Sequence, residues 1–198
     1  MTGPPLILAS ASPRRRELLA WAGIEFEVFP VEVDESVRPG EDPAVYARRL
    51  ALAKAEAAAV RFPGRFILSA DTVVVLDGRI MGKPRDARQA ADMLADLSGR
   101  VHQVITGFCL LGPEPGRLEL DHVTTQVEFR TLSARDIAWY INLGEVWDKA
   151  GAYAIQGCGA ALSRSVKGSY TNVIGLPLAE VLEALRRLGG APPYDRLK

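Results

Sequence analysis

The chain has 198 residues, of which 48% are hydrophobic and 24% are charged, proportions typical of a soluble globular protein. Its 24 basic and 24 acidic residues give a formal net charge of zero, which argues against a general nucleic-acid or membrane-surface binder. No apolar run approaches the length of a membrane span, the first residues lack the pattern of a secretory signal, and two isolated cysteines fit a reducing compartment. We therefore expect a cytoplasmic protein, in which any anionic ligand is small and is bound by a local cluster of charges.

The first predicted element is a short buried strand at Leu6–Ala9, followed by a helix that begins at Pro13 with Ser12 as its N-cap. Three arginines at 14–16 crowd the first turn of this helix, where free backbone N–H groups and the helix dipole favour anions instead. A bound phosphate would explain them, because helix N-termini bind phosphate and guanidinium groups pair with its oxygens. The alternative is three solvated arginines near an unrelated carboxylate.

Strands and helices alternate along the rest of the chain, which predicts an α/β architecture. Long hairpins favour a mixed sheet flanked by helices over a purely parallel sheet, and Asp77-Gly78 is the strongest hairpin signal. Between 148 and 175 we expect a glycine-rich region with short strands, and 191–198 resembles a loose tail. The remaining predicted elements are strands at 26–29, 66–76, 101–111 and 118–129 and helices at 43–60, 86–97, 133–143 and 177–188.

Asp71 is the most informative polar residue, because it lies inside the otherwise apolar strand at 66–76. A carboxylate buried there is costly unless it is paired, hydrogen-bonded or bound to a metal, although a bond to a neighbouring turn is the plainer alternative. A two-residue loop at 77–78 would extend the hairpin as far as a Thr72–Lys83 pair and so bring Lys83 beside Asp71. Adjacent strand residues point to opposite faces, so Asp71 and Thr72 are expected to share a pocket only if the strand bends or ends there.

Three further features are ambiguous when each is taken alone. Lys54 interrupts an apolar helix, yet it could be a surface lysine whose stem packs on the protein. Glu35 lies in an acidic loop that could simply be solvated, but with Asp71 it would supply two hard oxygen ligands of the kind that Mg²⁺ or Mn²⁺ uses beside substrate phosphates. The segment 148–157 could be a structural turn, although its Gln156 amide can both donate to and accept from a nucleobase edge. Together these parts suggest a small-anion site with acid, base and metal-binding capacity.

Eight short motifs follow one another over nearly the whole chain: LILASASPRR at 6–15, VDE at 33–35, AKA at 53–55, ADTVV at 70–74, GKP at 82–84, HQVITG at 102–107, DKAGAY at 148–153 and NVIGLPL at 172–178. In this order they closely resemble the Maf family of nucleoside triphosphate pyrophosphatases. The resemblance implies a single domain over residues 1–198, with a mixed twisted sheet flanked by helices and two lobes around a cleft, similar to inosine triphosphate pyrophosphatases. It also implies hydrolysis of a nucleoside triphosphate to the monophosphate and pyrophosphate, with a divalent metal ion, by a homodimer.

The resemblance also assigns site residues. The family's catalytic carboxylate falls on Asp71, which we expect to act as a general base, with a Mg²⁺ or Mn²⁺ ion near Glu35 and Asp71. The positions that discriminate substrates fall on Arg14, Thr72 and Gln156. Other pocket positions fall on Ser10, Arg15, Glu35, Lys54 and Lys83.

In the expected mechanism, Ser10, Arg14 and Arg15 grip the triphosphate together with N–H groups of the first helical turn. Lys54 and Lys83 offset the charge that builds on the pyrophosphate leaving group.

The segment Tyr153–Gly157 resembles the branch of the family that acts on dTTP and UTP, with modified pyrimidine nucleotides as further candidate substrates. Two alternatives stay open. One is a nucleotide-binding regulator of cell division or septum formation with little turnover, and the other is a pyrophosphatase for other non-standard nucleotides. In each case the ligand is a small nucleotide, and we expect neither a nucleic acid nor a membrane as a partner.

Overall fold

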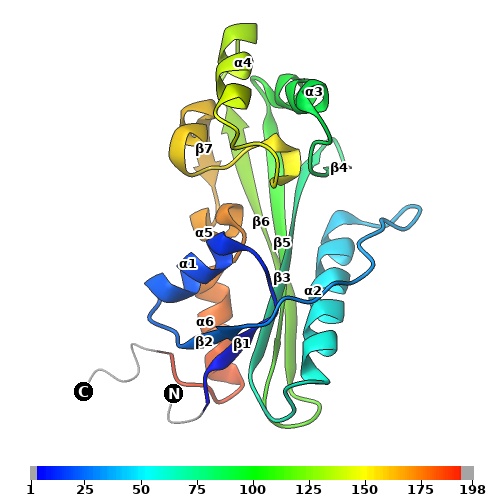
Figure 1. Ribbon diagram of the computed structural model, residues 1–198, viewed down its shortest axis with the longest axis vertical. Coiled ribbons are helices and arrows are strands. Elements are labelled where there is room, and N and C mark those ends of the chain that lie inside the picture. Colours follow the sequence, from blue (N-terminus) through cyan, green and yellow to red (C-terminus); the bar gives the residue numbers. More distant parts are fainter. Residues whose placement is uncertain (1–3, 193–198) are drawn as a thin grey trace.

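The computed structural model describes residues 4–192, in which a mixed sheet runs along the molecule between helices (Figure 1). The sheet has the order β2-β1-β3-β5-β6-β7, and β4 pairs with β3 beside this path. Strands β1, β2 and β3 pair in parallel, whereas β3, β4, β5, β6 and β7 meet their neighbours in antiparallel ladders. The strands are β1 (Leu6–Leu8), β2 (Phe26–Val28), β3 (Ile67–Leu76), β4 (Arg79–Met81), β5 (Val101–Leu111), β6 (Leu118–Phe129) and β7 (Ser163–Lys167). The α/β class with a mixed sheet, predicted above, is confirmed.

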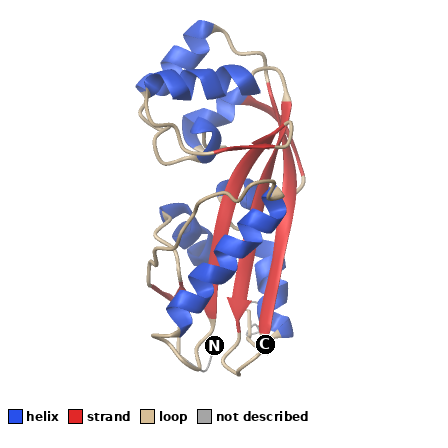
Figure 2. Ribbon diagram, turned by 90° about the vertical axis from the view of Figure 1, so that its right-hand side faces the viewer, coloured by secondary structure: helices blue, strands red, loops and turns tan. Residues whose placement is uncertain are grey.

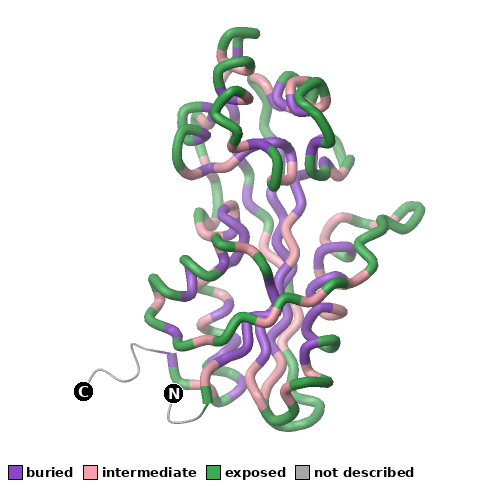
Figure 3. The backbone as a smooth tube through the Cα atoms, viewed as in Figure 1, coloured by how far each residue is buried: buried purple, intermediate pink, exposed green. Residues whose placement is uncertain are grey.

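Helix α2 covers one face of the long strands, and α1, α5 and α6 lie on the other (Figure 1). Figure 2 shows α2 lying along the strands, with α3 and α4 gathered at one end of the molecule. The helices are α1 (Pro13–Trp21), α2 (Pro43–Ala59), α3 (Ala87–Leu97), α4 (Ala134–Asn142), α5 (Tyr170–Ile174) and α6 (Leu178–Arg187), with short 3₁₀ helices η1 (Ala150–Ala152) and η2 (Gly157–Leu162). Buried positions follow the central strands and the helix faces that pack on them (Figure 3). None of the helices in residues 4–192 is both long enough and apolar enough to cross a membrane.

The hairpin between β3 and β4 forms as predicted only near its turn. Asp77 and Gly78 take φ angles of 50° and 75°, the left-handed conformation that a tight two-residue hairpin turn requires. The predicted register holds from Leu76 outward for three pairs. The predicted Thr72–Lys83 pair, and the Val73–Gly82 pair before it, are wrong because β4 ends at Met81. There the chain leaves the ladder, and the carbonyl of Gly82 accepts a hydrogen bond of 3.0 Å from the N–H of Gly151.

The glycine-rich region at 148–175 is less extended than expected. Within it the described chain forms one strand, β7, together with η1, η2 and α5. Gly151 and Gly157 take φ angles of 67° and 61°, which fold the backbone back on itself and exclude a continuous strand. Of the loose tail expected at 191–198, residues 193–198 lie outside the described part of the chain.

One edge of β3 is open in the middle of the sheet. On that edge β1 pairs with Ile67 and Leu68, and β4 pairs with 74–76. Across residues 4–192, the intervening segment Ser69–Val73 pairs with β5 alone, on its opposite edge. The open edge therefore lies at Asp71 and Thr72.

Helix α2 approaches the sheet closely at Gly107 of β5, the residue opposite Asp71 in the antiparallel ladder. A Cβ atom at this position would lie 2.4 Å from the carbonyl carbon of Ala47 and 2.5 Å from its oxygen, so only glycine allows the approach. Lys54 follows Ala47 by seven residues, close to two helical turns, and so lies on the same face of α2. The close packing at Gly107 thus brings Lys54 over the middle of β3.

Candidate functional site

A cavity of about 580 Å³ lies at the open edge of β3. Its walls come from the end of β1 and the first turn of α1, from α2 and the loop before it, and from the segments 80–83, 148–156 and 173–175. Every site residue predicted from the sequence lines it: Ser10, Arg14, Arg15, Glu35, Lys54, Asp71, Thr72, Lys83 and Gln156.

Asp71 and Thr72 reach this one cavity although they are neighbours on a strand. Asp71 points toward Lys54 of α2, and Thr72 points the other way, toward Arg15 of α1. We expected them to share a pocket only if the strand bent or ended there, but β3 continues through both positions to Leu76. The cavity receives both side chains because it opens around an unpaired strand edge and so has access to both faces of the sheet.

Glu35 and Asp71 form an acidic wall of the cavity, and both of their carboxylates contact Lys54. Its ammonium lies 2.7 Å from Oδ1 of Asp71 and 2.7 Å from Oε1 of Glu35, while Lys54 as a whole is only 8% exposed. The loop that carries Glu35 is held in turn by Tyr46, whose hydroxyl donates a 2.8 Å hydrogen bond to the Glu35 carbonyl. Burial alone would raise the pKa of Glu35, but the hydrogen bond and charge of Lys54, with the charges of Lys83 and Arg15, bring it below its usual value. Glu35 is therefore ionised at neutral pH.

Glu35 and Asp71 lie close together because both contact the ammonium of Lys54. Their oxygens form a donor set suited to a hard divalent ion such as Mg²⁺ or Mn²⁺. The described residues contain no group of three or more His, Cys, Asp and Glu side chains that could hold a metal. Glu35 and Asp71 would thus leave most coordination positions to water and to substrate phosphates, which is how Mg²⁺ is commonly bound in phosphate-processing enzymes. The residues present fit the metal ion that the family resemblance implies.

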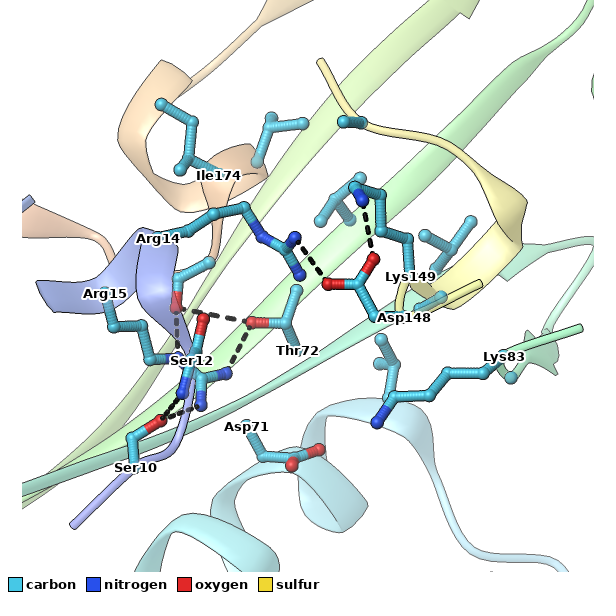
Figure 4. A pocket seen from close by; sticks show the side chains of 18 of the residues that line it. Ser10, Ser12, Arg14, Arg15, Asp71, Thr72, Lys83, Asp148, Lys149 and Ile174 are labelled. Carbon is cyan, nitrogen blue, oxygen red and sulfur yellow. Dashed lines mark hydrogen bonds and ion pairs between the residues drawn. The ribbon is translucent and has the colours of Figure 1, made fainter. Parts of the chain in front are cut away.

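The opposite wall is built around Arg15, which is 9% exposed. Its Nε donates to the carbonyl of Gly175 at 2.8 Å, its Nη1 to Oγ of Ser10 at 3.0 Å, and its Nη2 to Oγ1 of Thr72 at 3.1 Å (Figure 4). Burial lowers the pKa of the Arg15 guanidinium, while the charge of Asp71 acts in the opposite direction. An arginine remains charged in proteins, so Arg15 supplies a fixed positive charge and ties α1 to β3 and to the end of α5.

Arg14 reaches across the cavity to the segment before η1. Its Nη1 lies 3.1 Å from Oδ2 of Asp148, whose other oxygen accepts a 2.6 Å hydrogen bond from the ammonium of Lys149 (Figure 4). Burial alone would raise the pKa of Asp148, but Lys149 and Arg14 hold it below its usual value. Of the three arginines in the first turn of α1, two therefore line the cavity, and Arg16 is exposed on the surface.

Comparison with known proteins gives the same family as the motifs. The family model of the Maf-like proteins matches residues 5–188. The chain belongs to the Maf family.

Two relatives carry the name dTTP/UTP pyrophosphatase. The protein from Syntrophotalea carbinolica is 53% identical to this Maf chain over 186 residues, which cover 93% of this chain and 84% of the relative. The protein from Geobacter sp. strain M21 is 51% identical over 189 residues, which cover 96% and 98%. A solved nucleoside-triphosphatase, described as a dITP/XTP pyrophosphatase from Mycobacterium abscessus, matches with a TM-score of 0.43 and 21% identity over 66% of this chain and 77% of that one.

Two charged residues of this Maf site were not predicted from the sequence. Asp148 and Lys149 both line the cavity, and their signal was the DKAGAY motif, which alone reads as a structural turn.

Ser12 occupies the N-cap position of α1 as predicted, but its side chain makes no capping hydrogen bond. Instead, the N–H of Ser12 itself donates to Oγ of Ser10 at 3.2 Å.

The last two predicted residues close the site from the side of β4 and η2. Lys83 is exposed and extends toward the space between Asp71 and Asp148 in the close view (Figure 4). Gln156 is half-buried, immediately before η2. Their positions provide a cation and an amide at two further points of the same cavity.

Proposed function

We propose that this Maf protein is a nucleoside triphosphate pyrophosphatase that hydrolyses dTTP and UTP to the monophosphate and pyrophosphate. The observation that carries the proposal is the convergence of Asp71 and Glu35 on Lys54, facing the arginines of α1 across one cavity. An acidic wall can activate water and hold a metal ion, while a cationic wall can bind a triphosphate. The names of the two relatives described above support the choice of dTTP and UTP.

Arg14, Lys83 and the first turn of α1 are the groups best placed to bind the triphosphate. A guanidinium has five N–H donors, and Arg14 uses one nitrogen toward Asp148, so it can also pair with phosphate oxygens. Arg15 already donates to three protein acceptors, which supports a main role in fixing Ser10 and Thr72. Its positive charge still contributes to the attraction of phosphate.

Asp71 is our candidate for the general base. Its Oδ1 accepts from Lys54, which fixes the carboxylate and leaves Oδ2 to take a proton from water. The water oxygen attacks the α-phosphorus, the bond from this phosphorus to the bridging oxygen breaks, and pyrophosphate leaves with that oxygen. A divalent ion held by Glu35 and Asp71 would supply positive charge to the phosphates when bound. Lys83 would balance the charge that develops on pyrophosphate.

Gln156 is our candidate for reading the pyrimidine ring. Uracil and thymine present carbonyl oxygens beside an imide N–H, and a side-chain amide can donate to the first and accept from the second. We also propose the remaining features that the resemblance implies, which are activity on modified pyrimidine triphosphates, a homodimer in the cytoplasm and a single domain over residues 1–198.

Pyrophosphate release from a panel of triphosphates tests this function. The purified protein is incubated with dTTP, UTP, CTP, GTP and ATP, with Mg²⁺ or Mn²⁺ and separately with a chelator. We expect the fastest release from dTTP and UTP, and loss of release with the chelator. Nucleotide binding without release would instead indicate a regulator, and a preference for another nucleotide would indicate a different pyrophosphatase.

A further inference from the structure

The lining of the cavity has a charged part and an uncharged part. The charged side chains are those of Arg14, Arg15, Glu35, Lys54, Asp71, Lys83, Asp148 and Lys149. The lining segment 153–156 carries no charge, and its apolar residues share a hydrophobic cluster with further lining residues, namely Val74, Val104 and Ile174. A triphosphate is attracted to the charged part, which leaves the uncharged part, with the single amide of Gln156, to the nucleoside.

The segment 153–156 is held from behind by Tyr140 of α4. The backbone N–H of Ala154 donates a 3.0 Å hydrogen bond to the hydroxyl of Tyr140. Tyr140 is 0% exposed and does not belong to the cavity lining. Any effect of Tyr140 on a nucleotide in the cavity therefore passes through the segment that it holds.

The contact between Tyr140 and Ala154 is closed in by the chain that follows. A Cβ atom at Gly159, within η2, would overlap the carbonyl oxygen of Ala154 and would lie 2.8 Å from the hydroxyl of Tyr140. Burial raises the pKa of Tyr140 to about 12, and the charge of Glu145 acts in the same direction, while the bond from Ala154 opposes them. The phenol is therefore neutral at neutral pH, and the surrounding backbone limits how far Ala154 can move from it.

The preceding residue, Tyr153, is anchored independently. Its hydroxyl lies 2.7 Å from Nε2 of His102, and its ring meets the ring of Phe129 edge to face with 4.8 Å between the centroids. Residues 153 and 154 are thus both fixed to the protein interior. Only the buried Ile155 separates them from Gln156, so these two anchors set where the Gln156 amide lies.

We propose that Tyr140 is a positioning residue for the nucleoside, which holds the segment 153–156 so that Gln156 faces the base. The inference rests on the proposed function and deepens it. A wall that is held in place before the nucleotide arrives does not have to be ordered by binding, and this saving increases affinity. Loss of the Tyr140 hydroxyl would leave the N–H of Ala154 without its acceptor, and the segment would then shift to reach water.

Tyr140→Phe tests the proposal, because phenylalanine keeps the buried ring but cannot accept from Ala154. We expect kcat/KM for dTTP to fall about tenfold, the equivalent of one lost hydrogen bond. The change should lie in KM, with kcat within about twofold of wild type, because contacts to an uncharged ring are the same before and during attack at the α-phosphorus. Tyr170→Phe removes a hydroxyl from a ring that is 48% exposed and is the matched control, which should keep both constants.

A double-mutant cycle separates positioning of Gln156 from a general structural role. If Tyr140 acts through Gln156, Tyr140→Phe should change kcat/KM by less than about twofold in a protein that already carries Gln156→Ala. Should Tyr140→Phe not give a cooperative thermal transition, Ala154→lactic acid takes its place, since this backbone ester removes the N–H donor and keeps every side chain.

Three results would overturn the inference while leaving the pyrophosphatase intact. They are an unchanged kcat/KM in the folded variant, a loss that lies in kcat instead of KM, and independent effects of the two substitutions in the cycle. Wild-type protein that releases no pyrophosphate from dTTP would overturn the proposed function itself.

Discussion

The ammonium of Lys54 lies 2.7 Å from Oδ1 of Asp71, and both side chains are almost fully enclosed by the protein. The same ammonium contacts Glu35, so one cation pairs with both carboxylates of the site and leaves a net charge of −1. The expectation that Lys54 offsets charge on the pyrophosphate leaving group stays a prediction. In the described structure Lys54 is the group that keeps the acidic wall together.

Lys54→Met is therefore expected to destabilise the protein by about 3 kcal/mol, the usual cost of leaving a buried charge without its partner. Turnover of dTTP should fall by about 100-fold, because Asp71 loses the contact that orients it. Urea unfolding at neutral pH and initial rates measure the two effects. Lys149→Met is the matched control, since its partner Asp148 is largely exposed and such pairs contribute about 1 kcal/mol or less. Equal stability of the two variants would contradict the role given to Lys54.

Arg14→Ala is expected to lower kcat/KM for dTTP by about 10- to 100-fold, because a charge-assisted bond to phosphate is lost. The free energy of unfolding should change by less than about 1 kcal/mol, since the pair with Asp148 is partly exposed. Arg16→Ala, in the same helical turn but exposed on the surface, should leave both quantities unchanged. If both arginine variants lost activity equally, the effect would come from general charge and not from the cavity.

We expect the protein to lose stability in mild acid because His102 is buried. The ring is 2% exposed, its Nε2 lies 2.7 Å from the hydroxyl of Tyr153, and burial lowers its pKa from 6.5 to about 4. The folded state disfavours protonation of His102, whereas the unfolded chain does not. The contribution of His102 to the free energy of unfolding is therefore fully present above pH 6.5 and is lost as the pH falls toward 4. The loss from this group amounts to about 3 kcal/mol.

Urea unfolding across this pH range measures the effect. His102→Gln should remove most of the dependence, whereas His122→Gln, on a partly exposed ring, should retain it. A wild-type stability that does not change between pH 6.5 and 4 would contradict the effect assigned to His102.

Gly107→Ala tests the close approach of α2 to the sheet. The added methyl group would overlap the backbone of Ala47, so we expect a loss of about 3 kcal/mol or an unfolded protein. Gly82→Ala is the control, because a Cβ atom there meets nothing within 4 Å. Thermal and urea unfolding compare the two variants. If Gly107→Ala were as stable as the control, α2 would not be held at the distance described.

The elements of this fold were largely predictable because their signals are local. The strands at 101–111 and 118–129 and the turn at Asp77-Gly78 occur as predicted, since apolar runs and turn residues act within a few positions. The extension of the hairpin to Lys83 was wrong because a distant residue, Gly151, binds the carbonyl of Gly82. Local patterns carry no information about such a competing partner.

The sequence predicted which residues line the site, but not how the folded chain arranges them. The family motifs identified the lining residues Asp71, Thr72 and Arg15, yet the sequence does not reveal that β3 has an open edge between β1 and β4. That gap explains how neighbouring side chains on opposite faces serve one cavity. The pairing of Arg14 with Asp148, 134 positions apart, is likewise a product of the folded chain.

The most direct test of the central claim is the fate of the attacking oxygen. Hydrolysis of dTTP in water enriched in heavy oxygen, followed by mass spectrometry of the products, identifies the phosphorus atom that water attacks. Attack at the α-phosphorus predicts heavy oxygen in the nucleoside monophosphate and none in pyrophosphate. Heavy oxygen in pyrophosphate, or release of orthophosphate with a nucleoside diphosphate, would contradict the account.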